Sequence, residues 1–116
     1  MAVSEGHLAF VLDQLAGLGE LRSRRMFGGV GLYCGDAFFG LIDDGILYLK
    51  VDDTTRARYT RRRLKPFAPD GIPSMSYYPV PASILEDADA LVVWAREAVG
   101  VAQRAAKRPA RRGSAL

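Results

Sequence analysis

The sequence predicts an α+β domain in which helices pack as one layer on an antiparallel sheet. Apolar residues recur at helical spacing over residues 4–18 and again near the C-terminal end. Between these stretches the apolar pattern shortens towards period two, which is typical of strands. Two short junctions, Gly35-Asp36 and Asp44-Gly45, separate apolar runs and are strong hairpin signals. The predicted order of elements is α-β-β-β-α-β-β-α, in two layers.

Size and composition indicate a globular protein. The 116 residues suit one domain with a single core, and 49% hydrophobic with 25% charged residues is not the composition of a disordered chain. We expect a cytoplasmic protein with no membrane association, because no apolar run approaches the ~18 residues of a membrane span and no secretion signal is recognisable. The lone cysteine, Cys34, cannot form an internal disulfide and is expected to be a small buried hydrophobe.

The first predicted helix spans residues 4–18, with Ser4 as its N-cap and Gly19 as its stop. One face of this helix carries the apolar residues Leu8, Val11, Leu12, Leu15 and Leu18. An antiparallel meander follows, over residues 22–34, 37–43 and 46–51. In its last strand one face is apolar and is expected to meet the helices, whereas the other is mixed. The apolar face consists of Leu47, Leu49 and Val51, and the mixed face of Ile46, Tyr48 and Lys50.

A second helix is predicted from an N-cap at Asp52-Asp53 to about Leu64, before Pro66. Its outer face is dense in cations and must be either solvated or bound. The next segment, residues 67–74, is expected to be a loop with a brief pairing at Phe67-Ala68.

A short strand over residues 75–78 is expected to lie at a sheet edge or to end there, because Pro79 and Pro81 lack the amide donor. The last helix begins at an Asp87 cap and ends before Pro109. Its narrow apolar stripe consists of Leu91, Trp94, Ala95, Ala98, Val99, Ala102 and Ala105. We therefore expect a domain over residues 1–106 and a basic, disordered tail over residues 107–116.

Three glycines, Gly28, Gly29 and Gly31, fall where their neighbours in residues 24–33 predict a buried strand. Glycine packs no side chain, so this pattern indicates the close approach of another element, a bulge or a ligand. A phosphate-binding loop would lead into a helix, whereas this segment leads into a hairpin. We favour a packing role. The alternative is a small-molecule enzyme with a pocket at residues 28–31.

No set of residues typical of catalysis or metal binding is recognisable. One histidine, His7, and one cysteine cannot supply a tetrahedral zinc site or a Ser-His-Asp or Cys-His arrangement. Asp43 and Asp44 precede Gly45 and are interpreted as turn residues rather than as paired catalytic carboxylates. The sequence predicts a non-enzymatic protein without cofactor or metal.

The net charge of +3 is unevenly distributed. Residues 1–97 hold eleven Lys/Arg against thirteen Asp/Glu, a net of −2, and all of the remaining basic residues are near the C-terminus. The candidate contacts to a partner or to nucleic acid are cations and two tyrosines: Arg56, Arg58, Arg61, Arg62, Arg63, Lys65, Tyr77, Tyr78, Arg104, Lys107, Arg108, Arg111 and Arg112. The simpler alternatives are a solvated helix face, a solubilising tail, and one tyrosine buried by strand alternation.

Several motifs, in order, resemble the N-terminal domain of the TfoX/Sxy competence-regulator family over roughly residues 4–106. They are Met26-Phe27-Gly28-Gly29-Val30-Gly31-Leu32-Tyr33, Phe39-Gly40-Leu41-Ile42, Leu47-Tyr48-Leu49-Lys50-Val51, Met75-Ser76-Tyr77-Tyr78-Pro79-Val80-Pro81 and Trp94-Ala95. The resemblance implies the same two-layer arrangement and no catalytic residue. It also implies competence regulation, in which characterised members act as co-activators with the cyclic-AMP receptor protein at promoters of DNA-uptake genes. Full-length members carry a C-terminal domain where this sequence has a short basic tail.

Two hypotheses follow from the residues and the resemblance. The first is a regulatory domain that binds a protein partner, either the transcription machinery or a regulator, as a monomer or homodimer. The second is a nucleic-acid-binding accessory protein that uses the basic tail and the Arg56–Lys65 helix.

Overall fold

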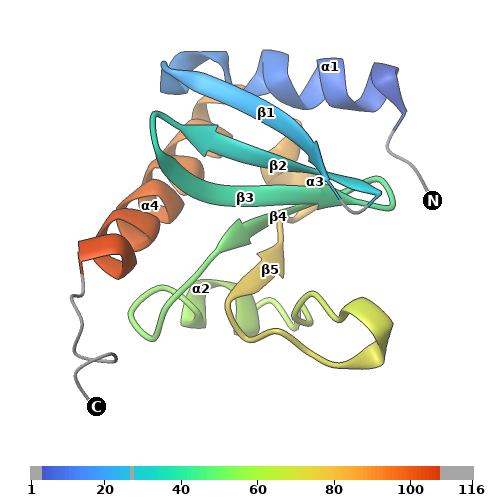
Figure 1. Ribbon diagram of the computed structural model, residues 1–116. Helices are drawn as coiled ribbons and strands as arrows, with labels where there is room; N and C mark the ends of the chain where they lie inside the picture. The colour runs from blue at the N-terminus through green and yellow to red at the C-terminus, as the bar shows by residue number, and fades with distance from the viewer. Residues whose placement is uncertain (1–3, 27, 108–116) are drawn as a thin grey trace.

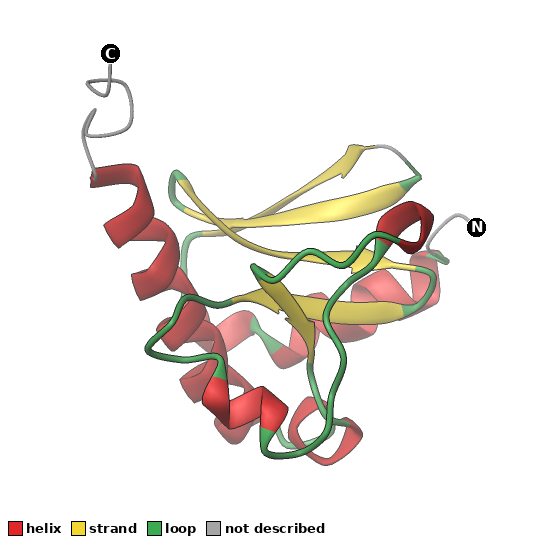
Figure 2. Cartoon of the chain, turned by 90° about the horizontal axis from the view of Figure 1, so that it is seen from below, coloured by secondary structure: helices red, strands yellow, loops and turns green. Residues whose placement is uncertain are grey.

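A five-stranded antiparallel sheet with strand order β1-β2-β3-β4-β5 forms the centre of the protein in the computed structural model, which describes residues 4–26 and 28–107. The strands are β1 (Leu21–Met26), β2 (Gly29–Cys34), β3 (Ala37–Asp43), β4 (Ile46–Lys50) and β5 (Tyr77–Pro79). Figures 1 and 2 show the helices gathered on one side of this twisted sheet. The predicted α+β class with an antiparallel sheet is confirmed.

The helices are α1 (Glu5–Gln14), α2 (Ala57–Thr60), α3 (Ala82–Leu85) and α4 (Ala88–Lys107), with short 3-10 turns η1 (Ala16–Leu18) and η2 (Pro69–Gly71). Two predicted caps are confirmed. The Ser4 hydroxyl accepts from the His7 amide at 3.1 Å, and an Asp87 carboxylate oxygen accepts from the Ala90 amide at 3.1 Å. Among the described residues, no helix has the length and apolar character needed to cross a membrane.

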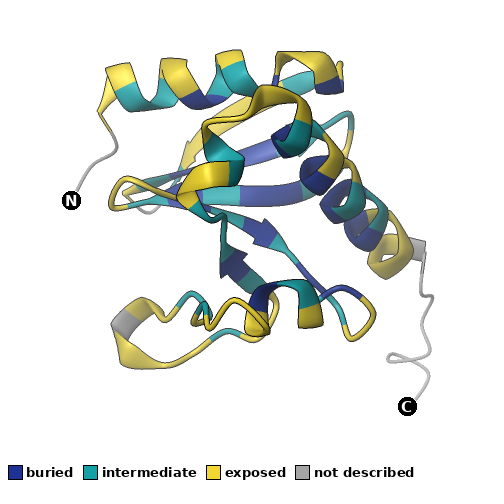
Figure 3. Ribbon diagram, turned by 180° about the vertical axis from the view of Figure 1, so that it is seen from behind, coloured by how far each residue is buried: buried dark blue, intermediate teal, exposed yellow. Residues whose placement is uncertain are grey.

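The hydrophobic core lies between the sheet and the helix layer, where α4 packs across β3 and β4 (Figure 3). The predicted apolar faces of the first helix and of β4 are confirmed, with Val11, Leu15, Leu47 and Leu49 all buried. The stripe of α4 is also buried, except for Ala105, which was predicted to belong to it and is exposed. The helix therefore projects beyond the sheet in its last turn.

A register shift in the β2–β3 ladder follows Leu32, which pairs with Gly40 while Tyr33 pairs with Phe38. The extra residue, Phe39, is fully buried in the core. Phe38 instead lies on the outer sheet face beside Tyr33, with ring centroids 5.1 Å apart. Neighbouring residues of a regular strand already alternate between faces, so the effect of the shift is that Phe39 and Ile42, three residues apart, both face the core.

Several predicted boundaries were wrong. The first helix, predicted over residues 4–18, ends at Gln14 and is followed by the 3-10 turn η1. The single strand expected over residues 22–34 is two strands, β1 and β2, joined by a turn in which Gly28 has φ +81°. The second helix is shorter than the predicted 52–64, because hydrogen bonds to the third preceding residue surround α2 and make tight turns. The pairing expected at Phe67-Ala68 is one bridge from Phe67 to Ser74 rather than a strand, so β5 is the only strand after α2 in the described chain.

The two edges of the sheet differ in length and chemistry. At one edge, β1 has six residues and exposes Arg22 and Arg24. At the other edge, β5 has three residues and ends in Pro79. The predicted edge position of this strand is confirmed, but the strand spans Tyr77–Pro79 rather than residues 75–78, with Pro79 paired to Tyr48.

Candidate functional site

Exposed arginines gather around α2, which is attached to the rest of the fold by one aromatic residue. Tyr59 is buried, and its ring contacts Trp94 of α4 edge-on at 5.1 Å and Tyr78 of β5 at 5.7 Å between centroids. This burial raises the pKa of the Tyr59 phenol above its usual value. Because Tyr59 alone faces the core from α2, the arginines on either side of it point to the surface.

The segment before α2 is fixed by Asp52. Its carboxylate accepts hydrogen bonds from the Thr54 amide and hydroxyl at 2.9 and 2.6 Å, and its own amide donates to the Thr55 hydroxyl at 3.1 Å. These bonds cap the turn before α2, whereas α2 itself begins after Arg56 with no side-chain cap, so the predicted helix N-cap at Asp52-Asp53 is wrong. These bonds to Thr54, with a 3.0 Å ion pair to Arg104, lower the pKa of Asp52 to about 2.

The segment after α2 ends in a left-handed residue. Arg63 has φ +61°, which lets the Leu64 amide donate back to the Tyr59 carbonyl at 3.2 Å. Glycine or asparagine normally occupies such a position, because a side chain is strained there. An arginine at this place keeps a cation on the surface next to α2.

Two arginines of this region lie against the indole of Trp94. The Arg58 guanidinium carbon is 4.7 Å and that of Arg62 5.3 Å from the ring centroid. With Arg61 and Val93 they line a hollow of about 560 Å³, which we call the arginine–tryptophan cleft. Sequence analysis found these arginines but not their contact with Trp94 or the exposed Val93. The spacing of Arg58 and Arg62, four residues apart, was the available signal that they share a face.

The cations around α2 fall into paired and unpaired sets. Arg56 binds Asp53 at 2.7 Å and the Met75 carbonyl at 3.2 Å, and Arg58 binds Glu97 at 3.4 Å. Within the described residues, the exposed cations Arg61, Arg63 and Lys65 form no ion pair. The unpaired positive charge thus lies on the C-terminal side of α2.

The two candidate tyrosines lie on opposite faces of β5. Tyr78 is 1% exposed and belongs to the core, so its proposed role as a surface contact is wrong and the simpler expectation of strand alternation holds. Tyr77 is half-buried on the outer sheet face, where the Lys50 ammonium lies 4.9 Å from its ring centroid. Burial raises the pKa of Tyr77 to about 12, with a smaller contribution from Tyr33.

The basic residues near the C-terminus are only partly described. Arg104 is not a free cation, because it binds the Asp52 carboxylate at 3.0 Å and so ties α4 to the loop before α2. Lys107 is the last residue of α4, and its side chain lies outside the described part. Arg108, Arg111 and Arg112 lie outside the described residues, so their role and the predicted domain boundary stay predictions.

The glycines of β2 serve close packing, as predicted. A Cβ on Gly29 would lie 2.5 Å from the Ile42 carbonyl oxygen, and one on Gly31 would lie 2.7 Å from Met26 Cε and 2.8 Å from Phe38 Cε1. The space at these positions is thus filled by the protein itself. A shallow hollow of about 520 Å³ lies beside them, lined mainly by apolar groups that include Met26, Phe38 and Phe67.

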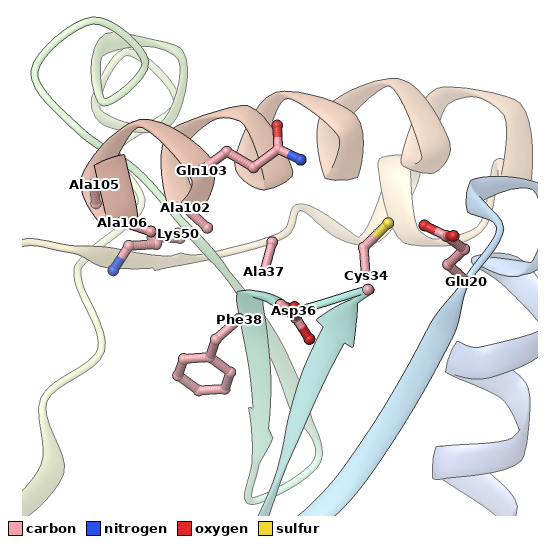
Figure 4. Close-up of a pocket in the computed structure, with 11 residues that line it drawn as sticks. Glu20, Cys34, Asp36, Ala37, Phe38, Lys50, Ala102, Gln103, Ala105 and Ala106 are labelled. Atoms are coloured by element: carbon pink, nitrogen blue, oxygen red, sulfur yellow. The ribbon is translucent and has the colours of Figure 1, made fainter. Parts of the chain in front are cut away.

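A larger open groove of about 810 Å³ lies between the end of α4 and the β2–β3 turn (Figure 4). Its walls are alanines of α4 and turn residues, with Glu20 and Cys34 together at one end. The half-buried Cys34 thiol donates to the Gly19 carbonyl at 3.5 Å. In the described part of the chain, no three His, Cys, Asp or Glu residues are grouped so that they could hold a metal ion.

Comparison with known proteins places these features in a family. The sequence model of the TfoX N-terminal domain matches residues 13–102. The DNA transformation protein TfoX1 of Aliivibrio fischeri is 37% identical over 78 residues, an alignment that covers 59% of this chain and 37% of that protein. The chain therefore spans well under half of the length of this curated relative.

Proposed function

This chain belongs to the TfoX N-terminal domain family, a family of competence and transformation regulators, and on that premise we propose that it is a non-enzymatic regulatory domain acting through a protein partner in transcription. The family match over residues 13–102 carries the proposal. The exposed, unpaired cations beside α2 support it, because they offer a charged surface that the fold itself does not use. Membership of this family indicates no catalytic function.

The proposal is tested by deleting the gene in its own host and measuring transcripts of DNA-uptake genes. We expect those transcripts to fall, and to return when the gene is restored. In parallel, the tagged full chain is expected to co-purify with a component of the transcription machinery or with a regulator. Unchanged transcripts in the deletion strain, under conditions in which the wild-type strain expresses both this protein and the uptake genes, would contradict the proposed function.

A second candidate function, direct nucleic-acid binding, is favoured by the unpaired cations Arg61, Arg63 and Lys65 and by the sequence of the tail. Removing residues 108–116 tests the tail and leaves the Arg104–Asp52 ion pair intact. If Arg108, Arg111 and Arg112 each contact a phosphate of duplex DNA, the slope of log K against log salt becomes shallower by about 2.7 on truncation. An unchanged slope excludes the tail as the binding element.

A further inference from the structure

Two guanidinium groups of the arginine–tryptophan cleft, those of Arg58 and Arg62, are preorganised for ligand binding. Arg58 and Arg62 both lie against the Trp94 ring, which is only 7% exposed beneath them. Stacking restricts long side chains that would otherwise lose much rotamer freedom on binding. A planar guanidinium held in this way presents its N–H donors in a fixed orientation, which suits the two oxygens of a carboxylate.

The cleft also has an apolar wall. Val93 is 60% exposed and lines the hollow beside Trp94 and Arg61. The positive charge around this wall is uneven. Glu97 neutralises Arg58, whereas Arg61 has no ion pair among the described residues. The cleft thus offers cations on one side of a small apolar patch.

These features favour a protein ligand over nucleic acid. Bases bind aromatic side chains by stacking on an open ring face, and the Trp94 ring is covered by two arginines. A nucleic-acid backbone favours a continuous track of cations, whereas Glu97 and Asp53 interrupt this one. An exposed valine offers little to a phosphate but suits an apolar side chain.

We propose that the arginine–tryptophan cleft docks an acidic segment of a partner protein, in which carboxylates flank one apolar side chain. The carboxylates bind Arg61 and Arg62, and the apolar side chain packs on Val93 at the edge of the Trp94 ring. Arg63, held beside the cleft in its left-handed conformation, adds to the attraction for the acidic segment. This proposal rests on the proposed function and specifies the chemistry of the partner.

The sole tryptophan of the chain, Trp94, reports binding directly through its fluorescence. The full chain is titrated with a short synthetic peptide of Asp and Glu residues around one Leu. Two matched peptides serve as controls, one with Asn and Gln in place of the acids and one with Ser in place of Leu. Single-stranded and duplex DNA are titrated under the same salt conditions.

We expect the acidic peptide with Leu to change the Trp94 emission saturably and both control peptides to bind more weakly. Arg61→Glu is expected to weaken the acidic peptide about tenfold or more, because it replaces an attraction by a repulsion. Arg24→Glu reverses an exposed arginine of β1, on a distant strand, and is expected to leave affinity unchanged. Val93→Ser is expected to weaken the Leu peptide but not the Ser peptide. Thermal unfolding of each variant confirms that the fold is kept.

Equal affinity for acidic and amide peptides, or no effect of Arg61→Glu, overturns the docking proposal. Binding of DNA to the cleft without binding of the peptide overturns it in favour of the nucleic-acid alternative. Its failure is separable from failure of the proposed function. If transcripts depend on the chain but Arg61→Glu has no effect on either peptide or transcripts, only the docking site is wrong. If the peptide binds as expected but deletion leaves transcripts unchanged, only the regulatory role is wrong.

Discussion

Gly29→Ala and Gly31→Ala compare two kinds of close contact in one strand. At Gly29 the added Cβ would meet a backbone atom, the Ile42 carbonyl oxygen, at 2.5 Å. That oxygen belongs to the neighbouring strand β3, so relief requires the two strands to separate. At Gly31 the added Cβ would meet the ends of two side chains, Met26 Cε at 2.7 Å and Phe38 Cε1 at 2.8 Å. Methionine can change rotamer, so part of this clash can be relieved locally.

The expected loss of unfolding free energy follows this difference. Overpacking of a well-packed site typically costs about 1–3 kcal/mol, and more where the backbone must move, so we expect about 3 kcal/mol for Gly29→Ala and about 1.5 kcal/mol for Gly31→Ala. Gly6→Ala is the matched control, since its added Cβ meets nothing within 4 Å and α1 gains a better helix former. It is expected to stabilise the protein by about 0.5 kcal/mol.

Urea unfolding followed by Trp94 fluorescence measures all three variants. A loss of 3 kcal/mol is a large part of the ~5–15 kcal/mol that holds a typical domain folded, and lowers Tm by more than about 10 °C in a domain of this size. The reasoning is refuted if Gly29→Ala is as stable as Gly6→Ala, or if Gly31→Ala is the more destabilised of the two β2 variants. Either result would mean that these glycines are not required by the packing of β2.

Three further changes have definite expected outcomes. Arg63→Gly relieves the left-handed backbone at φ +61° and is expected to stabilise by about 1 kcal/mol in urea unfolding, while weakening any acidic ligand. Phe39→Ala empties a fully buried site and is expected to destabilise by about 3–5 kcal/mol in the same assay. Because the pKa of Asp52 is lowered to about 2, its carboxylate stabilises the fold above pH ~4, the range of a free carboxyl, and this stability is lost as the pH falls towards 2. Asp52→Asn is expected to lack this part of the acid sensitivity in urea unfolding measured as a function of pH. Because Asp52 is partly exposed to solvent, the expected difference in unfolding free energy is less than about 1 kcal/mol. Equal acid sensitivity of the variant and the wild type would contradict the assignment.

Local signals in the sequence predicted much of the fold. Ser4 and Asp87 cap their helices with short side-chain bonds that any helix start of this kind forms, whatever it packs against. The Asp44-Gly45 hairpin has positive φ at both residues, as its composition indicates. These elements are determined within a few residues, so no tertiary information was needed to find them.

Elements that depend on contacts between residues far apart in the sequence were harder to predict. The length of α2 is limited by tight turns around Tyr59, whose burial against Trp94 and Tyr78 is visible only in the folded chain. The short helix α3 after Pro81 was not predicted, because its single turn has no apolar periodicity. For the site, residue types indicated the cations correctly, but which of them are paired depended on partners such as Glu97 that are far away in sequence.

The edge strand β1 affects the tendency of this protein to self-associate at high concentration. The unpaired side of β1 is a template on which the edge of a second molecule could add as a further strand, the first step towards aggregation. Arg22 and Arg24 are exposed on this strand, with the Arg22 guanidinium lying on the Tyr33 ring and the Gly35 carbonyl, so two copies meeting there in antiparallel register would place like charges near one another. We therefore expect β1 to repel its own copies, so that any homodimer must form through another surface.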